Sequence, residues 1–104
     1  DVFIGEWGEP DGRLEEALRR ARLYLEAGAD CVYPIWLADD ATIASFVAET
    51  GAPVNVYYRP GAPSFARLAE LGVARISLGP GLHRLAEEAT RAALARIATG
   101  TEPY

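Results

Sequence analysis

The stretch ELGVARISLG, residues 70–79, joins the end of a helical pattern to a glycine and a short apolar run. Gly72 stands where the helix must end, because glycine adopts a left-handed backbone without strain. The following run, Arg75 to Leu78, is short and bounded by glycine, as buried parallel strands are. The same junction occurs twice more, as EAGADCVYPI (residues 26–35) and ETGAPVNVYY (residues 49–58). This repetition predicts a helix, a turn and a parallel strand three times over.

Helical patterns fill the intervals between these junctions. We expect helices from Asp11 to about Ala27, from Asp40, from Ser64, and from about Leu82 to Thr99. Asp11, Asp40 and Ser64 have side chains suited to cap the first three helices. The last helix should bury one apolar face, formed by Leu85, Ala89, Ala92 and Ile97. The run Val2 to Ile4 precedes the first helix and is expected to be the first strand.

The resulting order, βαβαβαβα, predicts an α/β fold of four βα units in a single domain, residues 1–104. Four such units form half of an eight-unit (β/α)8 barrel, or a small open sheet. Either arrangement leaves two unpaired sheet edges, which natural proteins avoid. We therefore expect the edges to be covered by the rest of a longer chain or by a second copy. The absence of Met also suggests that the chain does not begin at a translation start.

Composition narrows the classes of function. The chain has 104 residues, 50% of them hydrophobic, and a net charge of -5, which favours a folded acidic domain over a disordered one. An acidic chain argues against nucleic acid as a partner, and no apolar run reaches the roughly 20 residues of a membrane span. The acidic start and the single cysteine, Cys31, favour a cytoplasmic location and a buried, inert thiol. Without Lys the chain cannot form a Schiff base, and with His83 alone it cannot form a multi-histidine metal site.

Candidate site residues follow from the strand ends, because barrel enzymes place their chemistry at the carboxyl ends of the strands. Those ends carry Glu6 with Trp7, then Trp36, Arg59 and Gly79. Glu6 is either a general base or metal ligand, or a solvated loop carboxylate. The tryptophans either wall a pocket or pack in the core. Arg59 either binds a carboxylate or phosphate, or pairs on the surface.

Side-chain alternation along the strands adds further candidates. If Val54 and Val56 face the helices, then the side chains between them and beyond them face the barrel interior. The expected substrate-binding set is therefore Glu6, Asn55, Tyr57, Arg59, Ser77 and Gly79. Gly79-Pro80-Gly81 also opens the last helix, where backbone N–H groups can hold an anion. Asp39-Asp40 precedes an apolar helical pattern, so it is interpreted as a helix cap rather than a catalytic pair.

Five segments carry a resemblance to a known family: LEEALRRA (14–21), EAGAD (26–30), PVNV (53–56), PGAPS (60–64) and LAELGVARISLG (68–79). Over about Gly12 to Thr99 the chain resembles the C-terminal half of the isocitrate lyase and phosphoenolpyruvate mutase superfamily. It is most similar to the small bacterial phosphonomutase-like members. The resemblance implies a TIM barrel whose last helix, here about 82–99, is often exchanged between subunits of a homo-oligomer.

The resemblance also implies a chemistry. Members of the superfamily bind Mg²⁺ and an α-keto acid or related carboxylate, and they make or break a C–C or C–P bond next to it. Their acidic metal motif and mobile Lys-Cys-Gly loop lie in the N-terminal half. The Mg²⁺ ligands are therefore expected outside this chain, which should be inactive alone. Many members also have an Ala-Arg-Thr-Asp motif whose arginine grips the substrate anion; this chain reads Gly5-Glu6-Trp7-Gly8 instead.

Two other interpretations stay open. The departure at Glu6 favours a non-catalytic module, in which two half-barrels pair their open edges in a symmetric dimer. A small flavodoxin-like sheet would need a phosphate-binding loop after the first strand. The segment Glu6 to Pro10 is acidic there, which disfavours that third interpretation.

Overall fold

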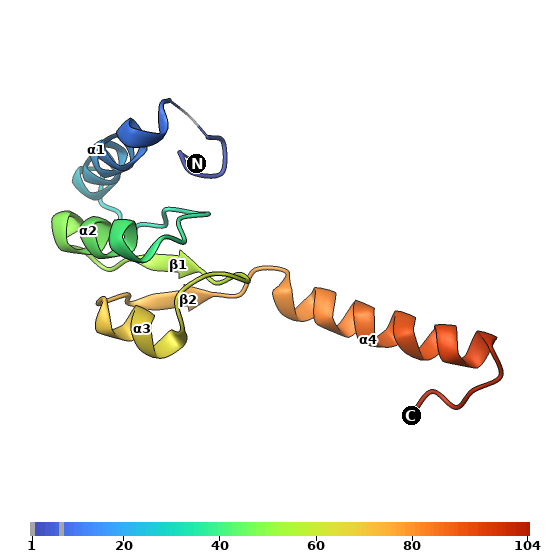
Figure 1. Ribbon diagram of the computed structural model, residues 1–104. Helices are drawn as coiled ribbons and strands as arrows, with labels where there is room; N and C mark the ends of the chain where they lie inside the picture. Colours follow the sequence, from blue (N-terminus) through green and yellow to red (C-terminus); the bar gives the residue numbers. More distant parts are fainter. Residues whose placement is uncertain (1, 7) are drawn as a thin grey trace.

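The computed structural model describes residues 2–6 and 8–104, and Figure 1 shows its arrangement. A 3-10 turn, η1 (Pro10–Gly12), leads into α1 (Arg13–Glu26), which is followed by α2 (Asp40–Thr50). Strand β1 (Asn55–Tyr57), helix α3 (Phe65–Glu70), strand β2 (Arg75–Ser77) and helix α4 (Gly81–Ala98) complete the order. Within the described residues, no helix is both long and apolar enough to cross a lipid bilayer.

The three predicted junctions are confirmed in their backbone. Gly28, Gly51 and Gly72 have φ values of 98°, 62° and 82°. Gly51 is the left-handed C-cap of α2, and its N–H donates to the carbonyl oxygen of Val47. Because only glycine takes this conformation without strain, the sequence pattern located the helix ends well.

The sheet is parallel, as predicted, but smaller than four strands. Strands β1 and β2 pair with Asn55 opposite Arg75 and Tyr57 opposite Ser77. The expected strand at 31–35 is reduced to one parallel bridge between Val32 and Val54. Cys31 is consequently exposed rather than buried in a strand.

The expected first strand, Val2 to Ile4, is wrong. Residues 2–6 form a turn, although Val2 is almost fully buried against the core. A strand exists only through its hydrogen-bonded ladder, and no described segment pairs with this one. The apolar run therefore packs its side chains without forming a strand.

The core lies between the helices and one face of the sheet. Ile43 and Phe46 of α2 and Leu68 of α3 meet Val54 and Val56 there. Helix α1 adds Ala17, Leu18 and Ala21. Outside the core, Arg67 ties α3 to α2, with its Nε 2.8 Å from an Asp40 carboxylate oxygen. The alternate residues of β1 are thus left to face away from the helices.

One predicted cap is confirmed, one is confirmed with a shift of one residue, and one is wrong. Ser64 Oγ accepts from the Arg67 N–H at 3.1 Å, as expected. At α2 the Asp39-Asp40 pair does cap the helix, but the accepting residue is Asp39 and Asp40 is the first helical residue. Asp11 caps nothing, because Pro10–Gly12 turns before α1 begins and places Asp11 inside η1.

Helix α4 extends away from the rest of the molecule (Figure 1). None of its residues is buried, so the expected core positions Leu85, Ala89, Ala92 and Ile97 are exposed in this chain. The radius of gyration is 18.2 Å, whereas a compact chain of this length has about 13 Å. The predicted helix is present, but the predicted burial of its apolar face is wrong for this single chain, which offers it no surface to pack on.

Candidate functional site

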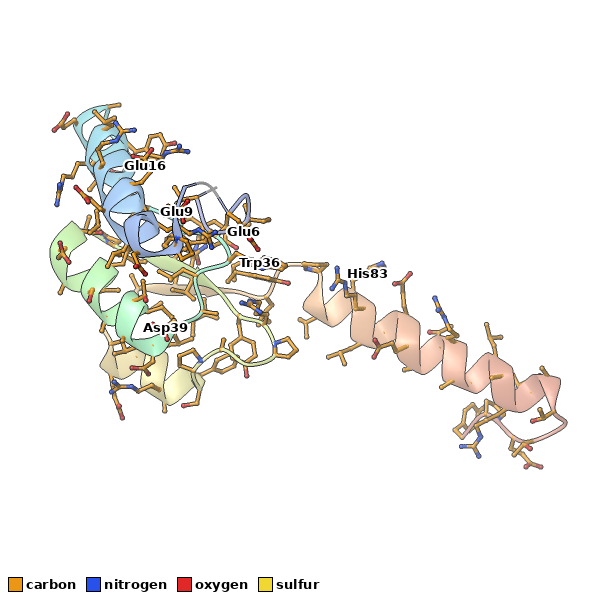
Figure 2. All side chains as sticks on the ribbon, turned by 45° about the horizontal axis from the view of Figure 1, so that its top comes forward. Glu6, Glu9, Glu16, Trp36, Asp39 and His83 are labelled. Atoms are coloured by element: carbon orange, nitrogen blue, oxygen red, sulfur yellow. The ribbon has the colours of Figure 1, made fainter. Side chains whose placement is uncertain are left out.

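An open cleft lies where the strands end. It has a volume of about 610 Å³ and takes residues from the turn at 2–6, η1, the start of α1, the loop before α2 and the loop after β1. Its lining includes Glu6, Asp11, Arg13, Trp36, Asp39, Thr42 and Arg59. Figure 2 labels Glu6, Trp36 and Asp39, which lie on the body of the molecule, away from His83 on α4. Three of the predicted strand-end residues, Glu6, Trp36 and Arg59, thus meet in one place.

Trp36 and Arg59, which line the cleft, belong to a stack of side chains that also includes Tyr57. The rings of Trp36 and Tyr57 are stacked, with centroids 5.5 Å apart and planes inclined by 21°. The guanidinium carbon of Arg59 lies 5.2 Å from the centroid of the Trp36 ring. This cation–π contact holds the guanidinium at the mouth of the cleft. The Nε of Arg59 is buried and finds no hydrogen-bond partner in the described chain.

Arg13 is the residue that sequence reasoning missed. Its terminal nitrogen Nη2 donates to the Glu6 carbonyl oxygen at 3.3 Å and lies 3.7 Å from Glu6 Oε2. Its Nε, like that of Arg59, is buried with no partner among the described residues. In the amino-acid sequence, Arg13 is recognisable only as a charged residue near the start of a predicted helix. Arg13 begins a helix and does not follow a strand, so the strand-end rule did not include it.

The remaining predicted residues lie on the face of β1 and β2 that points away from the helices. Asn55 is fully buried, and its Oδ1 accepts from Arg75 Nε at 3.2 Å. Ser77 lies opposite Tyr57 in the register. Gly79 lies against the Tyr57 ring. The alternation rule therefore grouped Asn55, Tyr57, Ser77 and Gly79 correctly, although their role in binding is a separate matter.

Two acidic residues of the cleft, Asp39 and Glu6, have partners within the protein. Asp39 Oδ2 accepts from the hydroxyl and the N–H of Thr42, and these bonds lower the pKa of Asp39. Glu6 lies against Arg13. No group of three or more His, Cys, Asp or Glu side chains within residues 2–6 and 8–104 is arranged to hold a metal ion.

Other residues singled out in the sequence lie elsewhere. His83 is exposed on α4, with Nε2 3.7 Å from Glu87 Oε1. Pro80 is the N-cap of α4 and makes no side-chain capping bond. Trp7 lies outside the described residues.

The comparisons with known proteins agree with this architecture. The family description of phosphoenolpyruvate phosphomutase matches residues 1–98. The chain therefore belongs to this family, and the resemblance stated from the sequence is confirmed. The strand-end cleft and the parallel βα units are consistent with part of a barrel.

Individual relatives are also similar. Two uncharacterized proteins, from two strains of Mycobacterium tuberculosis, are 33% identical over 84 residues, which is 76% of this chain and 32% of theirs. The structure of a proposed lyase/mutase from Burkholderia cenocepacia is 35% identical, with a TM-score of 0.82. The match covers 97% of this chain and 36% of the Burkholderia chain. A proposed phosphonomutase from the same species has 41% identity and a TM-score of 0.81, covering 92% and 39%. The chain thus spans about a third of the length of these relatives.

Proposed function

We propose that this chain forms the substrate-binding part of a lyase or mutase that makes or breaks a C–C or C–P bond beside an α-keto acid or related carboxylate. The observation that carries the proposal is the Tyr57–Trp36–Arg59 stack beside an open cleft at the strand ends. Membership of the phosphoenolpyruvate phosphomutase family supports the class of reaction. Two similar structures bear the descriptions lyase/mutase and phosphonomutase.

Each residue has a role in this proposal. Arg59 binds the carboxylate of the substrate, because its planar guanidinium donates two parallel hydrogen bonds to such a group. Asn55 and Ser77, which do not line the cleft, are proposed to contribute an amide and a hydroxyl from the strand face. Tyr57 supports the cleft residue Trp36 by stacking on it, and Gly79 leaves room for the Tyr57 ring. Glu6, at the cleft and largely exposed, is proposed to accept a proton.

Any Mg²⁺ that assists this reaction is proposed to be held by residues outside this chain. Two of the described acidic side chains of the cleft are already engaged, because Asp39 caps a helix and Glu6 lies against an arginine. No step is therefore assigned to a metal here. On the same ground we propose that the 104-residue chain alone is inactive.

The experiment compares two samples. The protein as its gene encodes it and the 104-residue chain are each mixed with Mg²⁺ and a panel of α-keto acids and phosphonates. The proposal expects substrate-dependent product from the first sample and none from the second. Turnover by the 104-residue chain alone would show that its own residues complete the site and would contradict the division of labour proposed here.

A second candidate function is a non-catalytic half-barrel module that assembles as a dimer. The observation that favours it is α4, which carries exposed Leu82, Leu85 and Ile97 away from the body. A homo-oligomer in which α4 packs on a second copy would cover this stripe. Sedimentation distinguishes the two, because the module must associate as the 104-residue chain, whereas the first proposal places no such demand on it.

A further inference from the structure

Two arginines in the cleft have donors that the protein itself does not satisfy. The Nε atoms of Arg13 and Arg59 are both inaccessible to solvent and without an acceptor in the described chain. A buried donor without an acceptor is costly, and more so when it carries charge. Both side chains line the same open cleft. A ligand that enters this cleft with acceptor oxygens therefore meets two guanidinium groups whose donors the protein leaves unsatisfied.

The acidic neighbours do not fill this role. Glu6 Oε2 lies 3.7 Å from Arg13 Nη2, whereas a full ion pair of this molecule, Arg19 with Glu16, has Nε and Oε2 2.7 Å apart. The Glu6 side chain is 78% exposed, so it can leave Arg13 for solvent at little cost. Asp39 is held by Thr42 through two hydrogen bonds.

We propose that Arg13 is a second anion-binding residue of the cleft, which with Arg59 holds an oxyanion group of the ligand, and that Glu6 is the counter-ion this group displaces. The nature of that ligand rests on the proposed function, but the site itself does not. The carboxylate of Glu6 therefore does not bar an anionic ligand, because Arg13 offsets its charge before binding and Glu6 turns to solvent when the ligand binds. Carboxylates and phosphonates share the oxygen acceptors that guanidinium groups prefer.

The test measures binding without turnover. Isothermal titration of the protein as its gene encodes it uses three probes: oxalate as a planar anion, methylphosphonate as a tetrahedral anion and oxamide as a neutral analogue. Binding of either anion, and not of oxamide, is expected. Oxalate alone would indicate a carboxylate ligand, and methylphosphonate alone a phosphonate or phosphate ligand. A protein that binds neither anion would overturn the inference.

Variants assign the binding to the two arginines. Arg13→Gln and Arg59→Gln should each lower the affinity for the anion by about ten- to hundredfold, the usual loss for a charge-assisted hydrogen bond. Arg22→Gln is the matched control, because Arg22 is exposed on α1 and does not line the cleft. Equal affinity in Arg13→Gln, Arg22→Gln and the parent protein would rule out the proposed role of Arg13.

Glu6→Gln distinguishes the proposed role of Glu6 from others by the direction in which anion affinity changes. A displaced counter-ion predicts tighter anion binding on its removal, by about two- to fivefold. A Glu6 that served as a metal or substrate ligand predicts weaker binding instead, which would contradict the inference. If Arg13→Gln fails to fold by circular dichroism, Glu6→Gln and Arg59→Gln decide the question. If the protein binds oxalate through Arg13 but shows no lyase or mutase turnover, the anion site is supported and the proposed function is contradicted.

Discussion

A β-carbon on Gly79 would lie 2.6 Å from Cε2 of Tyr57, closer than any real side chain tolerates. Gly79 follows β2 and Tyr57 ends β1, so the contact joins the two strand ends. Tyr57 in turn stacks on Trp36, which carries Arg59 over its ring. The position of Arg59 in the cleft therefore depends on the absence of a side chain at position 79.

Gly79→Ala should destabilise the protein and disturb the stack. The new methyl group must push back the Tyr57 ring, and the φ of +50° is unfavourable for alanine. Together these effects should cost about 1–3 kcal/mol in the free energy of unfolding. Urea denaturation measures the loss, and tryptophan fluorescence should report the altered environment of Trp36. In Gly81→Ala, where nothing lies within 4 Å of the added carbon, both readouts should stay close to the parent values.

The sequence anticipated this contact only in part. Strand alternation correctly predicted that Tyr57 and Gly79 share a face, because the period of two is a local property of any strand. The 2.6 Å approach depends on the parallel register of β1 and β2, which long-range pairing sets. The stack of Trp36 on Tyr57 likewise joins residues 21 positions apart in the chain.

Asp39→Ala should remove the cap of α2. Asp39 accepts from the N–H of Thr42 at 2.8 Å and from its hydroxyl at 2.6 Å. Loss of such a cap costs about 1 kcal/mol in most helices. Urea midpoints at neutral pH measure the change. Asp11→Ala is the control, since Asp11 accepts no capping bond, and an equal loss in both variants would argue against the cap as the cause.

The first 13 residues show where sequence reasoning failed. Val2 to Ile4 has strand composition, but the strand needs a partner that the described chain does not provide. Asp11 has capping chemistry, but Pro10 and Gly12 favour a turn that shifts the helix start to Arg13. That shift brings Arg13 against Glu6, which no local pattern predicts. The candidate site was thus found at the strand ends and missed at the helix that packs beside them.

Acid should weaken α1 through Glu16. Hydrogen bonds from Arg19 and then Arg20 lower the pKa of Glu16 from 4.5 to about 2. A carboxyl group with a lowered pKa in the folded state adds stability above its unfolded pKa, and this is lost as the pH falls through the folded pKa. The loss therefore falls between about pH 4.5 and pH 2 and is small, because the group is at the surface.

Glu16→Gln tests this assignment. The variant lacks the contribution at neutral pH, so its urea midpoint should fall less than that of the parent protein as the pH is lowered toward about 2. Glu15→Gln, at the neighbouring exposed position, should keep the parent pH dependence. If Glu16→Gln and Glu15→Gln showed the same slope, the acid sensitivity would have to come from other carboxyl groups.

On the proposal that α4 packs on a second copy, replacing Leu85 and Ile97 together by Gln should weaken self-association without unfolding the body. These side chains are 62% and 53% exposed, and no residue of α4 is buried in the single chain. Each would contribute about 1.5–3 kcal/mol once buried on a second copy, so the double variant should raise the dissociation constant at least tenfold. Sedimentation equilibrium measures the association, and circular dichroism checks the fold.

Arg91→Gln is the control. Arg91 lies on the opposite side of α4 from Leu82 by helical periodicity, so this variant should associate like the unsubstituted protein. If the unsubstituted protein sediments as a monomer, the proposal that α4 packs on a second copy is contradicted.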